Sequence, residues 1–523
     1  MAGSTDGFLE QDKRLSESLL WEINRRYYER RGAASWHSGE LPSYATCNTF
    51  IARAYAEVVL AYLHDASAAG MIDRREPVYL VELAAGLGRF AYQFVTSFRS
   101  LLDASALRGL DVCYVMTDFT HASVAAWRAH PLLGPLSRTL ALDFAWFDVD
   151  RHTYLDLASR GAHLTAGNVA NPVVVLANYA FDSFRQDLFH VERGVLHETV
   201  VSLSSPAPVD DLGAPGVLRA LRIGHAHREV TLAAATTDAA LATVLEGYRS
   251  RLPDCTIAVP TSGLRALEVI AALSGGRMLV LASDKGFTHE DELAGAEMQR
   301  IEQHADCFSM DVDLGAIGKW CEARGGGYAA SERRSLVLRT LAAWTGADAA
   351  ALAATRAAVK VHVEQFGPGE FFELLQHHRA SGAMTVEWIL SLVRLSGWEP
   401  QVLADFARPL VASVGAADAR VQRDVAIAMM RAYASYFPGA QDVPMAFARI
   451  AAAMHRPREA IEYALRSIAL FGERAEVCAE LGEFALAAED REAARRWITR
   501  ALALDPGSER ARRVLGQLDA PSA

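Results

Sequence analysis

The sequence predicts an α/β domain with a parallel sheet, followed by an all-α region that ends in helical repeats. Up to about residue 330, short apolar runs that end in glycine, acid or amide residues alternate with stretches of helical periodicity. Beyond about residue 335 the strand patterns stop, and near the end small residues recur at a spacing of about 34. Because 523 residues exceed one ordinary domain, we expect about two to four domains.

Residues 78–90 read as a buried strand, a glycine turn and the start of a helix. Gly86 and Gly88 allow a tight turn and a close approach to a ligand, and the following helix offers its N-terminal amides. Glu82 lies at the end of the strand. A dinucleotide site needs a third glycine where this chain has Ala91, which disfavours NAD.

The next strands also end in polar residues. Residues 112–118 end at Asp118, an acid that can hold ribose hydroxyls, and a third strand near residues 139–142 ends at Asp143 and Phe144. A fourth strand, residues 172–177, ends at residues 178–182. Open α/β sheets bind their ligands at such strand ends, so this order predicts a nucleotide-type cofactor site.

Four successive strand–helix units with these ends resemble the Rossmann-like class I fold of S-adenosylmethionine-dependent methyltransferases. The closest resemblance is to the MidA-type family (mitochondrial dysfunction protein A), described as protein arginine methyltransferases linked to complex I assembly. The resemblance covers roughly the first 330 residues. It implies S-adenosyl-L-methionine as cofactor, and the implied cofactor-binding residues are Glu82, Gly86, Gly88, Asp118, Asp143, Phe144 and Asn178.

Several local patterns carry the family resemblance. They are Tyr27-Tyr28, residues 44–48, Asp118-Phe119-Thr120, residues 178–182, and the late strand that ends at Asp284-Lys285-Gly286. The chain departs from the family at Asn48 and Tyr179, where the family has acids. Since a pair of carboxylates would hold a guanidinium, the departure leaves the acceptor open, with arginine as one candidate.

Asn178, Tyr179 and Asp182 are the candidate catalytic residues, because they would face the methyl acceptor. Plainer interpretations stand beside these roles. Glu82 and Asp118 fit turn or capping acids, and Asn178 fits a residue that satisfies the backbone at a strand end. We interpret Asp284 and Lys285 as a solvated turn and leave them out of the site.

Composition excludes several other functions. The 52 basic and 63 acidic residues give a net charge of −11, so we expect no nucleic-acid partner. The histidines form no metal motif, and the six widely spaced cysteines form no CxxC pair, which predicts reduced thiols and no metal. We expect no membrane span, no secretion signal and a cytoplasmic protein, and the alanine and arginine usage favours a bacterial source.

The expected domains are a methyltransferase domain over 1–330, with an N-terminal helical segment at 1–75 and a core at 76–330, then a helical region at 331–438. Residues 308–321, a short strand and a helix, would close the sheet. Residues 336–344 and 386–395 show helical periodicity. Over 439–523, small residues at the offsets of tetratricopeptide repeats predict stacked helix pairs, clearest at residues 475–506.

The leading hypothesis is a methyltransferase that acts on a protein or peptide side chain, docked by the C-terminal repeats. A small-molecule methyltransferase of specialised metabolism is the rival enzyme. The rival without activity is a methyltransferase-like scaffold or assembly factor that acts through its repeats. The sequence leaves the oligomeric state open.

Overall fold

The computed structural model describes residues 7–32, 44–139, 141–252, 254–295, 301–379 and 384–520. Leu140 in the expected third strand and the first six residues lie outside these ranges. The chain forms two compact units, Met1–Gln376 and His377–Ala523, which we describe separately. In the described ranges, no helix is both long and apolar enough to cross a membrane.

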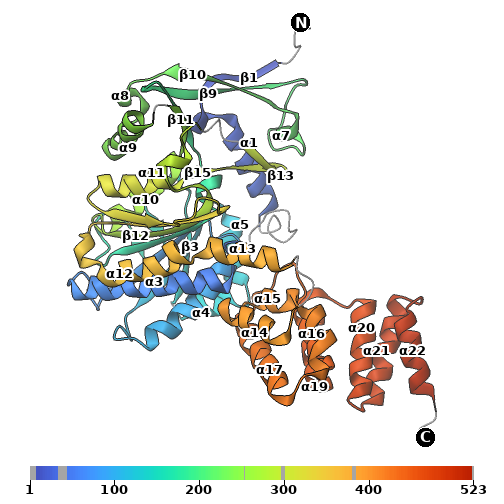
Figure 1. Cartoon of the computed structure of the whole chain (residues 1–523). Helices are drawn as coiled ribbons and strands as arrows, with labels where there is room; N and C mark the ends of the chain where they lie inside the picture. Colours follow the sequence, from blue (N-terminus) through green and yellow to red (C-terminus); the bar gives the residue numbers. More distant parts are fainter. Residues whose placement is uncertain are drawn as a thin grey trace. The chain divides into compact units, whose positions relative to one another are not determined.

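The first unit is built around a mixed sheet with helices on both faces (Figure 1). From one edge to the other its strands are β16 (Gly327–Ala330), β17 (Leu338–Thr345), β12 (Met278–Phe287), β7 (Val173–Asn178), β2 (Val78–Leu83), β3 (Val112–Asp118) and β4 (Leu142–Trp146). Strand β17 runs antiparallel to both β12 and β16, and the other pairs along this order are parallel. A short strand, β15 (Val312–Asp313), adds a further parallel pair to β12.

Helices α3 (Thr49–Ala68), α4 (Arg89–Asp103) and α12 (Ala353–Val359) lie on one face of this sheet, and α10 (Thr261–Leu273) and α11 (Leu314–Ala323) lie on the other (Figure 1). Strands β2 and β7 are buried along nearly their whole length, as expected for parallel strands covered on both faces. The first unit therefore has the α/β core that the sequence predicts.

A second, antiparallel sheet belongs to the same unit. It contains β1 (Gly7–Arg14), β9 (Val195–Ser205), β8 (Asp187–Glu192) and β11 (Asp254–Val259), and β10 (Arg222–Glu229) pairs with β9. Helix α1 (Leu19–Arg31) follows β1, and Ser18 caps it by accepting from the Leu20 amide. The N-terminal segment, expected to be helical, therefore begins with a strand.

The end of the main sheet corrects two further expectations. Residues 336–344, expected to be helical, contain β17, which is buried at every position and lies between β12 and β16. Its apolar run without alternation cannot be distinguished from a buried helix by periodicity. The expected closing element at 308–321 is correct only in part: β14 (Cys307–Met310) pairs with β13 (Ile301–His304) in a separate hairpin, whereas β15 joins the main sheet beside β12 and α11 packs against β17.

The second unit is helical throughout its described residues. The expected helix at 386–395 is α14 (Val386–Leu395). Two pairs of consecutive helices follow later in the chain: α18 (Val443–Ala453) with α19 (Pro457–Phe471), and α20 (Ala475–Ala487) with α21 (Arg491–Leu504). Within the last pair, a Cβ at Gly482 would lie 2.6 Å from Ile498 Cδ1, so the two helices cross closely there. Their assignment as tetratricopeptide repeats stays a prediction.

Candidate functional site

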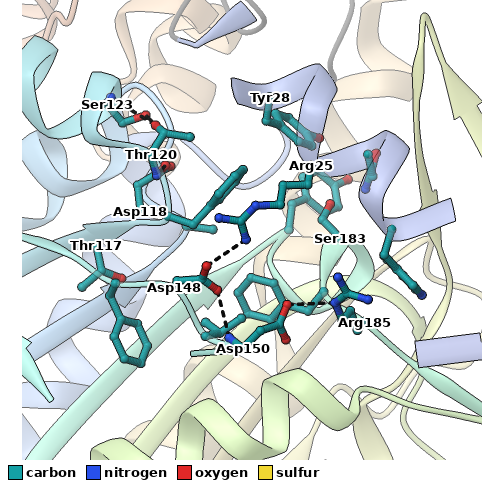
Figure 2. Close-up of a pocket in the computed structure, with 18 of the residues that line it drawn as sticks. Arg25, Tyr28, Thr117, Asp118, Thr120, Ser123, Asp148, Asp150, Ser183 and Arg185 are labelled. Carbon is teal, nitrogen blue, oxygen red and sulfur yellow. Dashed lines mark hydrogen bonds and ion pairs between the residues drawn. The ribbon is translucent and has the colours of Figure 1, made fainter. Parts of the chain in front are cut away.

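A cavity of about 120 Å³ opens at the carboxyl ends of the central strands of the first unit (Figure 2). Each of four strands contributes a residue at or just past its end, namely Ala84 after β2, Asp118 on β3, Asp148 after β4 and Tyr179 after β7. Along the sheet, β3 and β4 lie on one side of β2, and β7 and β12 lie on the other. The cavity therefore lies at the topological switch point, where open α/β sheets bind ligands.

The turn after β2 has an unusual backbone. Ala84, Gly86 and Gly88 all have left-handed φ angles, of 52°, 53° and 82°. An alanine in this region is strained, and such strain is typical of residues that approach a ligand. The Trp127 indole donates to the Gly86 carbonyl at 2.8 Å and fixes the turn from outside. The glycine turn expected from the sequence is thus present, and its first left-handed residue lines the cavity.

Glu82 lies two residues before this turn and is buried, with 4% of its surface exposed. Burial raises the pKa of its carboxyl to about 8, against a smaller opposing effect of Tyr114. Among the described residues, its Oε2 atom has no hydrogen-bond partner. A protonated carboxyl with a free oxygen can still form a hydrogen bond, so Glu82 is equipped for a polar partner at this turn.

Asp118 ends β3 and lines the cavity. Its Oδ1 atom accepts from the Thr120 amide at 2.8 Å, and Thr120 in turn caps helix α5 (His121–Ala129) by accepting from Ser123. Burial raises the pKa of Asp118, and hydrogen bonds with Thr120 and Ser123 partly offset that effect. Asp118 is therefore a turn acid that also lines the cavity, and its role as a cofactor-binding acid stays a prediction.

The structure places Asp143 and Phe144 away from the cavity, which corrects the expected third strand. Strand β4 runs Leu142–Trp146, so Asp143 lies near its start rather than at its carboxyl end. Its fully buried carboxylate accepts from the Ser159 and Arg160 amides at 2.7 and 2.8 Å. Phe144 is fully buried in the core. These contacts give both residues a structural role in holding the following loop.

Asp148 takes the strand-end position that the sequence analysis assigned to Asp143. It is 1% exposed, and its Oδ2 atom lies 2.8 Å from Nη1 of Arg25 on α1 (Figure 2). The Arg25 guanidinium also lies 4.8 Å from the centre of the Phe119 ring. Asp148 could have been found by extending the strand through residue 146, whereas Arg25 comes from a helix 123 residues earlier and carries no local signal.

Asn178 and Tyr179 lie at the end of β7, but only Tyr179 lines the cavity, whereas Asn178 contacts Tyr55. The Asn178 Oδ1 atom accepts from the Tyr55 hydroxyl at 3.2 Å, and Tyr55 also contacts Ser283 at 2.8 Å. Tyr179 lines the cavity with a left-handed φ of 46°, and burial raises its pKa. Asn48 caps α3 by accepting from the Ile51 amide, so it serves the helix.

Asp182 and Asp284 form a buried acidic pair beside the cavity. Their residues are 4% and 0% exposed, so the interpretation of Asp284 as a solvated turn is wrong. Burial raises the pKa of Asp182 to about 6 and that of Asp284 well above its usual value, with the Asp182 charge as a second cause for Asp284. The Ser183 hydroxyl, which lines the cavity, donates to Asp182 at 2.9 Å.

No protein-family model and no curated protein matches the chain. Two solved structures from Burkholderia thailandensis are similar to it, each over 65% of this chain and 90% of theirs. One is described as an uncharacterized protein, with 14% identity and a TM-score of 0.39. The other, of the same superfamily, is described as a "likely methyl transferase" bound to S-adenosyl-homocysteine, with 15% identity and a TM-score of 0.40. Both are too distant to define the function of this chain.

Proposed function

We propose that this protein is an S-adenosyl-L-methionine-dependent methyltransferase. The observation that carries the proposal is the cavity at the switch point of the sheet, where the left-handed turn after β2 and the carboxylate of Asp118 meet. A nucleoside-type cofactor requires a glycine turn whose backbone it can approach closely and an acid at the end of the next strand that can bind its ribose. The mixed α/β sheet around the cavity is consistent with a methyltransferase fold.

The residues present fit this cofactor. Asp118 would hold the ribose hydroxyls, since it lines the cavity and each of its carboxylate oxygens can accept more than one hydrogen bond. The turn that contains Gly86 and Gly88 would take the methionine end, with the unpartnered oxygen of Glu82 nearby in sequence. Asn178 remains a candidate contact at the end of β7. When bound, the cofactor supplies a methyl group on a sulfonium centre.

The acceptor side of the site is formed by Tyr179, Ser183 and Asp182. Tyr179 and Ser183 line the cavity, and Ser183 joins it to the buried Asp182 carboxyl. Methyl transfer requires an aligned acceptor and, where the acceptor carries a proton, a group that takes it up. Asp182, with a pKa of about 6, is a suitable base at neutral pH.

We propose a protein or peptide side chain as the acceptor, with the helical unit as the module that binds the protein carrying it. Helical repeats stack into surfaces that bind other proteins. Because neither Asn48 nor Tyr179 is an acid, these two positions cannot supply a carboxylate pair for a guanidinium, and Asn48 instead caps α3. Arginine is therefore one acceptor to test among several side chains.

One observation favours a second candidate, a scaffold without methyltransferase activity. Neither Asn48 nor Tyr179 supplies the carboxylate that the resemblance leads one to expect, and burial keeps the Tyr179 hydroxyl protonated by raising its pKa. Such a scaffold would act through its helical unit. A small-molecule acceptor is the remaining alternative within the same chemistry.

Calorimetric titration with S-adenosylmethionine and S-adenosylhomocysteine tests the proposal. Asp118→Asn preserves an acceptor for the Thr120 amide but removes the charge, so affinity should fall about tenfold or more, as expected for a lost hydrogen bond to a charged group. Asp156→Asn, at a side chain that is 66% exposed, is the matched control and should bind like the wild type.

Saturable binding that Asp118→Asn weakens would justify a search for labelled-methyl transfer to proteins, peptides and small molecules. Absence of binding by the correctly folded wild type would overturn the enzyme proposal and leave the scaffold as the better explanation.

A further inference from the structure

The guanidinium of Arg25, a residue of α1, points toward the strand ends and binds the Asp148 carboxylate (Figure 2). Its side chain is 18% exposed, and its guanidinium contacts two different partners in the cavity wall. One is the Asp148 carboxylate at 2.8 Å, and the other is the face of the Phe119 ring, with Cζ 4.8 Å from the ring centre. Both are favourable contacts for a planar cation.

The same two partners are those that the base of an adenosine cofactor would need. If Asp118 holds the ribose, the base must lie near the next residue, Phe119, which offers an aromatic face. The end of β4 is adjacent, because the Phe147 amide donates to the Asp118 carbonyl at 2.9 Å. Asp148 follows Phe147 directly and is the acid at that place that could accept from an exocyclic amine.

Asp148 accepts a hydrogen bond at each of its two carboxylate oxygens while Arg25 binds it. Its Oδ1 atom accepts from the Asp150 amide at 3.1 Å, and its Oδ2 atom is used by Arg25. Arg151 approaches the same oxygen only at 3.6 Å and is 69% exposed. The Arg25 guanidinium also lies over the Phe119 ring, so a base that stacks on that face of Phe119 while contacting Asp148 would displace it.

In the same conformation Arg25 also has a more exposed partner on its own helix. Glu29, one helical turn further along α1, accepts from Arg25 Nε at 2.9 Å and is 48% exposed. Arg25 can keep this outer partner when it gives up the inner one, so its charge stays paired in both positions.

We propose that Arg25 is a gate of the cofactor cavity, which competes with the cofactor base for Phe119 and Asp148 and keeps only its Glu29 partner when the base binds. This inference rests on the proposed function. It makes Arg25 a residue that sets cofactor affinity from outside the sheet, and it assigns the N-terminal helix a part in admitting the cofactor.

Calorimetric titration of S-adenosylhomocysteine into the full chain tests the gate. Arg25→Met keeps the apolar stem and removes the competing cation, so affinity should rise roughly three- to tenfold, which corresponds to the loss of one partly exposed ion pair. Adenosine alone should show a similar gain, because the competition concerns the base. Arg26→Met, at the neighbouring residue paired with Glu22, is the matched control and should leave affinity unchanged.

Arg25→Lys covers the case in which Asp148, left without its main partner, prevents folding of the methionine variant. Lysine keeps a cation near Asp148 but cannot lie flat on the Phe119 ring, so it should give a smaller gain in the same direction. Thermal unfolding of each variant shows that the compared proteins are folded.

The outcomes separate the gate from the proposed function. Wild-type binding with equal or weaker binding by both Arg25 variants would overturn the gate and make Arg25 part of the binding surface. Failure of the folded wild type and all variants to bind would overturn the proposed function, and the gate with it.

Discussion

The Asp182 backbone amide donates to Oδ2 of Asp284 at 3.2 Å, which places the two buried acids side by side. Strands β7 and β12 are in parallel register through Asn178 and Ser283, so the sheet brings Asp284, the next residue of β12, close to the turn after β7 that contains Asp182. Two acids this close and this buried cannot both ionise without cost. The folded protein therefore keeps protons on this pair at a pH at which the unfolded chain has released them.

Asp284→Asn should stabilise the first unit at neutral and alkaline pH. The pKa of both acids is raised in the folded protein, so the folded state is most stable relative to the unfolded chain below about pH 4, where both acids are protonated in both states. For Asp284 that stabilisation is lost as the pH rises from about 4 toward its raised pKa, and Asp182 loses its share as the pH rises through about 6. Asparagine is neutral at every pH, so the unfolding temperature of the variant relative to wild type should increase from pH 4 to pH 8. Parallel curves for the two proteins would show that the pair titrates normally.

Gly88→Ala should destabilise the turn after β2 by about 2 to 4 kcal/mol, the sum of backbone strain and overpacking. The φ of Gly88 is 82°, and a Cβ there would lie 2.6 Å from both Leu133 Cδ1 and Met116 Cε. Leu133 and Met116 are fully buried and have little room to move. Denaturant unfolding measures the loss, and S-adenosylhomocysteine titration should show weaker binding.

Gly109→Ala is the matched control for that substitution. Its φ is 83° and a Cβ there would meet nothing within 4 Å, so it should show only the strain of about 1 to 2 kcal/mol. Equal losses at Gly88 and Gly109 would mean that packing of the turn against α6 (Leu133–Arg138) and β3 contributes nothing.

The sequence was most informative where local pattern and burial agree. The strand that ends at Asp118 has the predicted bounds, and those that end near Leu83 and Asn178 differ by a residue or less from prediction. These are apolar runs, rich in valine, that stop at a glycine turn or a polar residue. The cavity follows from them because parallel strands place their ends at one edge.

The sequence predictions are wrong where contacts between residues far apart in the chain determine the structure. Asp143 looks like a strand-end acid, but it is accommodated inside β4 by two amides of a loop 16 and 17 residues away. Strand β17 has a helix-like composition and becomes a strand because both of its neighbours in the sheet hold it. Arg25 could not be assigned to the site, since only the packing of α1 brings it to Asp148.

Glu480 joins three helices of the second unit through one buried carboxylate. Arg449 on α18 binds both of its oxygens, at 2.8 and 2.9 Å, and Arg510 on α22 (Glu509–Asp519) lies 2.8 Å from Oε1. The Glu480 side chain is 5% exposed, whereas the two arginines are 44% and 40% exposed. The acid is thus the buried centre of a charge network that spans successive helices.

Glu480→Gln should destabilise the helical unit by about 2 kcal/mol, less than the full cost of breaking a buried pair because water can solvate the half-exposed arginines that remain. Glu476→Gln is the matched control, since Glu476 lies on the same helix, faces Arg449 at 3.4 Å and is 73% exposed. It should change stability by less than about 0.5 kcal/mol. Urea unfolding followed by circular dichroism measures both, and a Glu480 effect as small as that at Glu476 would show that apolar packing alone holds these helices together.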